Sequence, residues 1–137
     1  ALHLPTLEPR GAVAATVRIG DTRLRVVGMH LDISGLRRRQ QARAILNHLA
    51  AGEELPTILM GDCNEWRNQG GCLHDFGERH RLVDTGHSFH SRRPVAKLDR
   101  IFASPDLHAI ESGVHRSALA ARASDHLPIW ARFRPTG

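Results

Sequence analysis

Alternation of apolar and polar residues predicts a β-hairpin near the start of the chain. Apolar residues recur at every second position across Val13 to Ile19, and a second alternating run passes through Leu24 and Val26. Gly20 and Asp21 separate the two runs, and a Gly-Asp pair between alternating runs is typical of a hairpin turn. The segment before the hairpin, residues 1–11, has no period and is predicted to be irregular.

A helix is predicted between this hairpin and a third strand. Ser34 is a suitable N-cap, apolar residues recur at helical spacing from Ala42 to Leu49, and Gly52 and Pro56 end the pattern. The apolar run 55–60 is too short and too rich in β-branched residues for a helix and is predicted to be a buried strand. Strand, helix and strand in this order predict a crossover with parallel pairing. One helix face is predicted to be solvated, namely Arg37, Arg38, Arg39, Gln41 and Arg43.

Further elements follow from shorter patterns. Residues 67–71 are predicted to be a loop, and residues 85–94 have no period and are also predicted to be a loop. The other predicted elements are a short helix over Cys72 to Phe76, a return to the sheet at Leu82 and Val83, a strand over residues 98–103 that Ser104, Pro105 and Asp106 end, a strand near residues 110–115, and a last strand through Phe133.

Length and composition predict one domain or part of one. The 137 residues are 41% hydrophobic, which is enough for one core and too little for two ordinary domains. The first ten residues contain no signal-peptide core, and no run approaches the roughly 18 apolar residues of a membrane span. We therefore expect a cytoplasmic protein with no membrane span. Cys63 and Cys72 are too few for a disulfide framework and are expected to be reduced.

The net charge of +5 favours attraction to phosphate-rich partners. A compositional origin is the alternative, because Lys97 is the only lysine and the chain is rich in arginine and alanine, as products of GC-rich genomes are. Aromatic residues make up 4% of the chain and none is tyrosine, which leaves few platforms for stacking bases.

Polar, reactive residues stand at the ends of the predicted strands. If the backbone stays extended past Gly61, Asp62 and Asn64 point to one side while Cys63 points to the other. An Asx turn after the strand is the alternative. Ligands of open α/β sheets bind beyond strand ends, and carboxylate and amide oxygens suit magnesium, so the set favours phosphoryl-transfer chemistry. The set comprises His30, Asp62, Asn64, Asp99, Asp125 and His126.

Asp99 is predicted to need a partner. It shares a strand face with Ile101, and this face is directed inward. An inward carboxylate without a hydrogen bond would cost several kcal/mol, so Asp99 is either paired or a buried cap.

Four segments together resemble the motifs of the endonuclease/exonuclease/phosphatase superfamily. They are G-M-H-L-D, G-D-C-N-E-W, K-L-D-R-I-F and A-S-D-H-L-P-I, and the resemblance spans Arg10 to Phe133. The resemblance implies an α/β fold in which a mixed sheet with flanking helices forms half of a four-layer α/β/β/α sandwich, as in DNase I. It also implies a Mg²⁺-dependent phosphoesterase, with Mn²⁺ as the alternative ion. The implied substrate is a nucleic acid, a phosphorylated lipid or a phosphorylated small molecule.

The chain departs from the family pattern at two places. The family has an N-terminal half with an asparagine and a metal-binding glutamate, and nothing before Arg10 matches either. Residues 1–137 therefore resemble the C-terminal portion of one domain, with the N-terminal half as an implied partner and one apolar sheet face left bare. Cys63 stands where the family usually has an aromatic residue. The histidine of G-M-H-L-D is similar to that of the DNase I, sphingomyelinase and phosphatase branches, which disfavours the repair-endonuclease branch.

The resemblance also implies roles for the residues at the strand ends. Asp125 would bind the metal ion, and His126 would act on the scissile phosphate as a base or an electrostatic stabiliser. Asp99 would orient His126, so we expect a carboxylate oxygen roughly 2.6 to 3.2 Å from a ring nitrogen.

The remaining roles concern the attacking water and the developing charge. Asp62 would orient or deprotonate the water, Asn64 would donate to a phosphate oxygen, and His30 would steady the negative charge. Asp32 and Asp84 are interpreted as ordinary surface acids, with Asp32 as the first substitute if the metal site needs another carboxylate. The alternative function is a non-catalytic module that binds a phosphorylated ligand or partner on the same scaffold.

Overall fold

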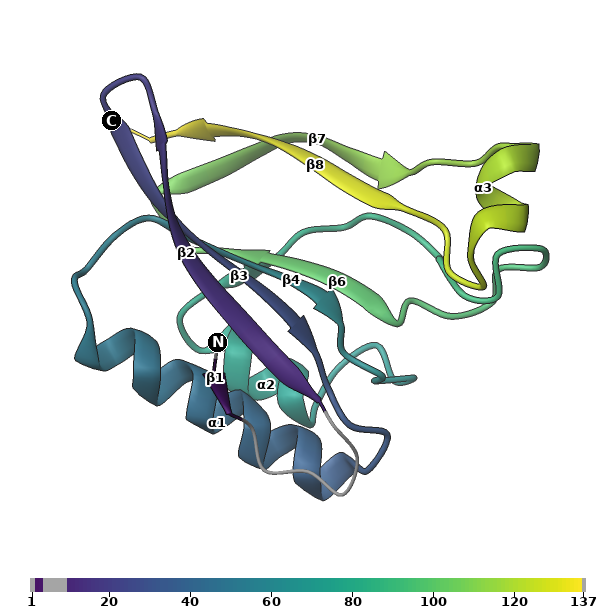
Figure 1. Ribbon diagram of the computed structural model, residues 1–137, viewed down its shortest axis with the longest axis horizontal. Coiled ribbons are helices and arrows are strands. Elements are labelled where there is room, and N and C mark those ends of the chain that lie inside the picture. The colour runs from purple at the N-terminus through teal and green to yellow at the C-terminus, as the bar shows by residue number, and fades with distance from the viewer. Residues whose placement is uncertain (1, 4–9, 137) are drawn as a thin grey trace.

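The chain folds around a mixed six-stranded sheet. The computed structural model describes residues 2–3 and 10–136. The strand order is β1-β2-β3-β4-β6-β5, with only the β3–β4 pair parallel (Figure 1). The strands are β1 Leu2–His3, β2 Gly11–Ile19, β3 Thr22–His30, β4 Thr57–Asp62, β5 Arg81–Leu82 and β6 Asp99–Ala103.

The predicted hairpin and crossover are both confirmed. Strands β2 and β3 pair antiparallel around a turn in which Gly20 has a φ of 60°, a conformation that glycine adopts at little cost. Strand β1 pairs with the beginning of β2, so the prediction of an irregular segment over residues 1–11 is wrong at Leu2–His3 and at Gly11. Arg10 lies in no strand or helix, as predicted, and residues 1 and 4–9 lie outside the described residues.

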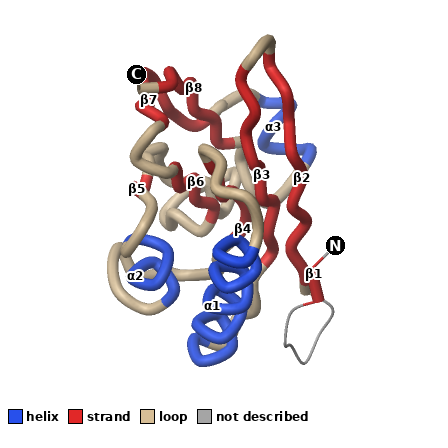
Figure 2. Tube along the Cα trace, turned by 90° about the vertical axis from the view of Figure 1, so that its left-hand side faces the viewer, coloured by secondary structure: helices blue, strands red, loops and turns tan. Residues whose placement is uncertain are grey.

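Two helices cover one face of the sheet. Helix α1, Gly35–Ala51, connects β3 to β4, and the short helix α2, Cys72–Gly77, lies beside it (Figure 2). The sheet row Val27, Leu59 and Phe102 is fully buried against these helices. Each large apolar side chain removed from water in this way stabilises the fold by roughly 1.5 to 3 kcal/mol.

A second, two-stranded sheet lies on the opposite side of the main sheet (Figure 1). It pairs β7, Leu107–Val114, with β8, Ile129–Pro135. Between them lies α3, Ala118–Ala123, which the sequence reasoning did not predict. The Ser117 hydroxyl caps this helix by accepting a hydrogen bond from the backbone N–H of Ala120 at 3.0 Å.

The sheet face opposite the helices is partly open. Val13, Gly28 and Met60 share one cross-strand row, and the side chains of Val13 and Met60 are 58% and 41% exposed. Val17, on the same face of β2, is 38% exposed. This exposed apolar surface agrees with the expectation of a bare sheet face. Among the described helices, none combines the length and the apolar character needed to cross a bilayer.

Candidate active site

Three polar side chains are brought together by strand register. His30 ends β3, Asp62 ends β4 and Asp99 begins β6. The register places His30 opposite Asp62, and Asp62 opposite Asp99. The three residues therefore form one row across neighbouring strands, at the edge where β3 and β4 end.

His126 reaches this row from the segment before β8. Its Nδ1 lies 2.6 Å from Asp99 Oδ2, so the predicted hydrogen bond between the two side chains is confirmed. Because the ionised Asp99 carboxylate can only accept, the proton of this hydrogen bond lies on His126 Nδ1. The other ring nitrogen, Nε2, lies 3.7 Å from Asp62 Oδ2. Ser88 Oγ donates to the same Asp99 oxygen at 2.5 Å. Sequence reasoning missed Ser88, because it lies in a loop without periodicity.

Asp62 also faces His30. The distance from Asp62 Oδ2 to His30 Nε2 is 3.5 Å, and the His30 side chain is half exposed. Arg10 Nη1 lies 2.7 Å from the same ring nitrogen and adds a positive charge beside His30. Sequence reasoning missed Arg10 because it precedes the first periodic segment.

Asn64 is held in a turn rather than in an extended strand. Its φ is 48°, and its backbone N–H donates to Asp62 Oδ1 at 2.9 Å, which is an Asx turn. The prediction of an extended backbone past Gly61 is therefore wrong at Asn64, and the alternative of an Asx turn is confirmed. Asn64 Nδ2 donates to the carbonyl of Leu31 at 2.7 Å and ties the segments after β3 and β4 together. Its amide group retains a second N–H for another acceptor.

Burial and neighbouring charges shift the pKa values of two of these groups. Burial raises the pKa of Asp62 and outweighs the opposing hydrogen bond from Asn64. Burial lowers the pKa of His126, but its hydrogen bond to Asp99 and the charge of Asp99 more than offset this effect, so the net pKa is raised. A carboxyl group with a raised pKa beside a stabilised imidazolium is suited to proton transfer.

The cluster offers ligand atoms to a cation. One atom from each of Asp62, Asp99 and His126 lies within 4.8 Å of the others. Asp125, predicted to be the metal ligand, lies outside this group and is exposed. Its backbone carbonyl accepts a hydrogen bond from the N–H of Ser91 at 2.7 Å, which fixes the backbone next to His126.

A buried charged cluster lies behind the turn that carries Asn64. Glu65 is 2% exposed, and its carboxylate contacts Arg38 Nη2 at 3.4 Å and Arg67 Nη2 at 3.1 Å. Arg100 Nη2 donates to the backbone carbonyls of Glu65 and Arg67 at 3.3 and 3.0 Å. This cluster, which we call the Glu65 cluster, anchors the segment after β4 to α1 and β6.

The predicted solvated face of α1 is wrong at two positions. Arg38 is buried because it donates to the carbonyls of Asp32 and Ile33 as well as contacting Glu65. Gln41 is fully buried because its side-chain oxygen accepts from the N–H of Asp32. Asp32 is itself buried, so its interpretation as a surface acid is also wrong. Asp84 is exposed, as predicted, and contacts Lys97.

Two aromatic rings follow one another beside His126. The ring of Phe89 lies 5.0 Å from the imidazole of His126, and the indole of Trp66 lies 5.7 Å from Phe89 at 84°. Phe89 lies in the same loop as Ser88, and Trp66 directly follows Glu65 in the sequence. Neither ring was identified from the sequence as part of the site.

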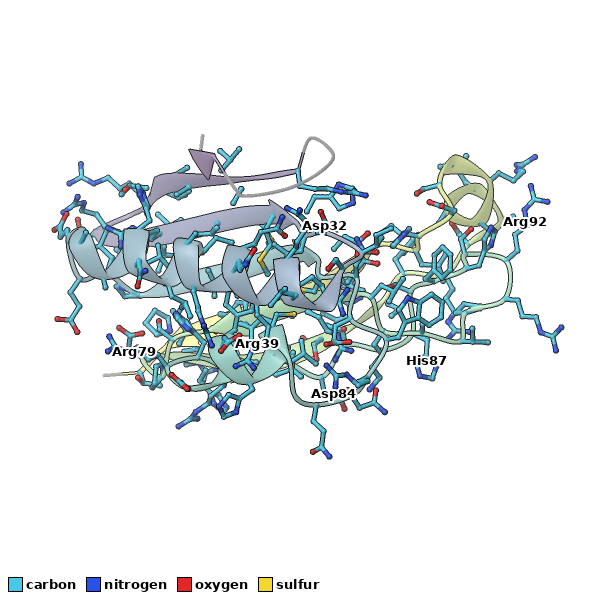
Figure 3. The ribbon with its side chains drawn as sticks, turned by 90° about the horizontal axis from the view of Figure 1, so that it is seen from below. Asp32, Arg39, Arg79, Asp84, His87 and Arg92 are labelled. Carbon is cyan, nitrogen blue, oxygen red and sulfur yellow. The ribbon has the colours of Figure 1, made fainter. Side chains whose placement is uncertain are left out.

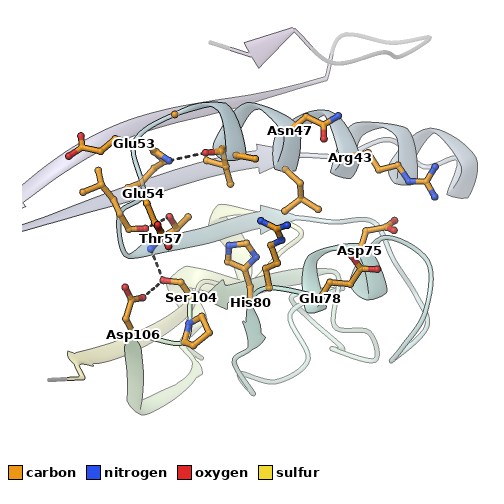
Figure 4. A pocket seen from close by; sticks show the side chains of 18 of the residues that line it. Arg43, Asn47, Glu53, Glu54, Thr57, Asp75, Glu78, His80, Ser104 and Asp106 are labelled. Atoms are coloured by element: carbon orange, nitrogen blue, oxygen red, sulfur yellow. Dashed lines mark hydrogen bonds between the residues drawn. The ribbon is translucent and has the colours of Figure 1, made fainter.

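A separate cavity of about 860 Å³ lies away from these groups (Figure 4). Thr57 at the beginning of β4 and Ser104 just after β6 line it, whereas Asp62 and Asp99 lie at the opposite ends of the same strands. Its lining mixes acidic and basic side chains, including Glu78 and Arg43. Figure 3 labels Arg39 and Arg79, which line this cavity, and Arg92, which does not.

Comparison with solved structures identifies the fold. An endonuclease/exonuclease/phosphatase from Bacteroides vulgatus is 20% identical, with a TM-score of 0.81 over 98% of this chain and 59% of that one. A mannosyl-6-phosphatase from Bacteroides thetaiotaomicron is 22% identical, with a TM-score of 0.66 over 84% and 52%. D. rerio TDP2, complexed with a single-strand DNA product, is 19% identical, with a TM-score of 0.73 over 94% and 63%. The chain thus has the DNase I-like α/β fold and spans about half to two-thirds of these relatives.

Sequence comparison identifies the family. The search of curated proteins gave no match. The sequence model of the Endonuclease/Exonuclease/phosphatase family matches residues 2–126, which is most of the chain and includes every predicted site residue. The chain therefore belongs to the Endonuclease/Exonuclease/phosphatase family.

Proposed function

We propose that this domain hydrolyses a phosphate ester with the help of a divalent cation, Mg²⁺ or Mn²⁺. The observation that carries the proposal is the arrangement of Asp99, His126 and Asp62, in which one carboxylate orients the imidazole and the other faces its free nitrogen. An oriented imidazole next to a carboxylate with a raised pKa is suited to moving a proton while charge develops on a phosphate.

The donor set fits a hard cation. Asp62 and Asn64 carry oxygen atoms at the end of β4, and Asp125 directly precedes His126 in the sequence. Mg²⁺ is commonly held by one or two carboxylates with water and phosphate completing the shell. We propose Asp125 as the principal ligand in this chain. Bound there, the cation would polarise a phosphate oxygen and neutralise developing negative charge.

The side chains have separate roles in this proposal. Asp62 orients the attacking water and accepts its proton, which its raised pKa favours. His126, held through Nδ1 by Asp99, presents Nε2 to the phosphate. Asn64 donates its remaining amide N–H to a phosphate oxygen, and His30, with the Arg10 guanidinium against its ring, steadies the developing negative charge.

We propose that the activity belongs to a domain that also contains the family's N-terminal half. The chain covers 59%, 52% and 63% of the three relatives described above. The open sheet face with Val13 and Met60 supports a packing partner on that side. Those relatives include a phosphosugar phosphatase and a protein complexed with DNA, so both nucleic acid and small phosphorylated molecules remain candidate substrates, together with phosphorylated lipids.

The experiment assays the protein that contains this chain against DNA, a phosphodiester lipid and phosphomonoesters. We expect Mg²⁺-dependent hydrolysis of at least one class, and loss of it with EDTA. His126→Ala and Asp62→Asn should each lower kcat by about 10² without lowering thermal stability. Asp84→Asn is the matched control, because this carboxylate is 92% exposed and outside the cluster.

Two results would contradict the proposal. Unchanged kcat in both variants would remove these residues from catalysis. Binding of phosphate esters without hydrolysis of any class would favour the non-catalytic binding module instead.

A further inference from the structure

Trp66 is an exposed aromatic residue on a rigid backbone. Its side chain is 59% exposed, although large aromatic residues are usually covered. The carbonyls on both sides of it, those of Glu65 and Arg67, accept hydrogen bonds from the buried Arg100. The Glu65 carboxylate is itself buried and paired. The indole is therefore presented to solvent by a fixed segment.

The ring is also fixed relative to the catalytic imidazole. Trp66 and Phe89 are nearly perpendicular, with centroids 5.7 Å apart, and Phe89 lies 5.0 Å from His126. Such a perpendicular contact is a preferred arrangement of two aromatic rings and so holds the indole in position. Trp66 and His126 are thus separated by the single ring of Phe89. If His126 contacts the phosphate, Trp66 is placed to contact a group attached to the phosphate.

We propose that Trp66 stacks on the base of a nucleotide ester and so determines specificity for substrates that carry a nucleobase. This inference rests on the proposed phosphoesterase function. Every base has a π-face on which an indole can stack, whereas a sugar or alkyl substituent has no π-system. The exposed Arg67 next to Trp66 and the net charge of +5 suit a ligand with phosphate groups.

The first test uses Trp66 as its own reporter. The chain has two tryptophans, so Trp130→Phe leaves Trp66 as the single source of indole emission. We expect AMP and a short single-stranded DNA to quench this emission, and ribose 5-phosphate to leave it unchanged. Comparing the mononucleotide with the oligonucleotide separates a free nucleotide from a strand as the source of the base.

The second test measures affinity and kinetics in variants. Trp66→Leu should weaken AMP binding at least about fivefold, which is the lower end expected for one stacked base. Trp66→Phe should restore most of that loss, because phenyl retains a flat face. Trp130→Leu is the control and should leave AMP binding unchanged. In the protein that contains this chain, Trp66→Leu should raise KM for a nucleotide ester and leave kcat nearly unchanged.

Separate outcomes overturn this inference and the proposed function. Equal affinities for AMP and ribose 5-phosphate, or an unchanged affinity in Trp66→Leu, would overturn stacking by Trp66. Blue-shifted Trp66 emission that acrylamide cannot quench would do the same, because another part of the protein would then cover the ring. Absence of hydrolysis with intact, AMP-dependent quenching would instead contradict the proposed function and leave the stacking site in place.

Discussion

Replacing Glu65 tests whether the Glu65 cluster stabilises the segment that carries Asn64 and Trp66. The Glu65 side chain is 3% exposed and its partner Arg38 is 9% exposed, at a contact distance of 3.4 Å. Glu65→Ala would leave the Arg38 guanidinium buried without a carboxylate. Removing one member of a buried ion pair costs about 3 to 5 kcal/mol, because the remaining charge is uncompensated. The contact with Arg67 adds little, since that side chain is 65% exposed and screened by water.

The assay is urea denaturation of the chain, with Glu53→Ala as the matched control. Glu53 forms two hydrogen bonds with Arg23 at 2.9 and 3.0 Å, but both side chains are about half exposed, so its loss should cost at most about 1 kcal/mol. We therefore expect the free energy of unfolding to fall several times further in Glu65→Ala than in Glu53→Ala. Equal losses in the two variants would refute the reasoning.

The pH dependence gives an independent measure of the same cluster. Burial raises the pKa of Glu65, but the hydrogen bond from Arg67 and the charge of Arg38 outweigh it, so the net pKa is lowered. A lowered pKa in the folded state means that this stabilisation is complete above the unfolded pKa of about 4.3. It is then lost as the pH falls through the folded value. Glu65→Gln should therefore have a flatter acid limb in its stability profile than wild type, and parallel profiles would contradict the assignment.

Two further changes test the geometry of the site. Gly61→Ala should lower the free energy of unfolding by at least about 3 kcal/mol, because φ is +145° and a Cβ would lie 1.8 Å from the carbonyl oxygen of Met29. Gly28→Ala, with no atom within 4 Å of the added carbon, is the control and should cost about 1 kcal/mol or less in urea denaturation; similar losses would show that the backbone relaxes freely. Asp99→Asn should lower the pKa of His126, measured by NMR titration of the ring protons, because it removes the charge that raises that pKa. An unchanged pKa would show that Asp99 does not control the imidazole.

Much of the site was predictable because strand ends are visible in the sequence. Alternation located the ends of the strands that carry His30 and Asp99, and a short apolar run located the end of the strand that carries Asp62. Sheets place ligands at such ends. The need of an inward carboxylate for a partner, together with the family resemblance that named His126, led to the predicted bond between Asp99 and His126. What the alternation could not supply was the register, which depends on long-range pairing and puts the three residues in one row.

The wrong predictions concern residues whose polar contacts do not change the hydrophobic period of the sequence. Arg38 lies on the polar side of α1 by composition, yet its side chain reaches back to the carbonyls that follow β3. Buried carbonyls at a strand end need donors, and an arginine on the next helix meets that need without changing the apolar period. The left-handed turn at Asn64 could be predicted only as one of two alternatives, because the same sequence is compatible with an extended strand and with an Asx turn.

The aperiodic loop between β5 and β6 determines where the imidazole of His126 lies. Ser88 connects Asp99 to the residue that follows His126, since its hydroxyl donates to Asp99 at 2.5 Å and its carbonyl accepts from the N–H of Leu127 at 2.8 Å. Ser91 extends the connection, because its hydroxyl donates to the carbonyl of Ser124 at 2.6 Å. These hydrogen bonds connect the segment before β8, a strand of the second sheet, to Asp99 of β6 in the first sheet. The position of His126 relative to Asp62 thus depends on a loop whose sequence has no hydrophobic period. The hydrogen bonds of this loop, and not its sequence pattern, account for the geometry of the site.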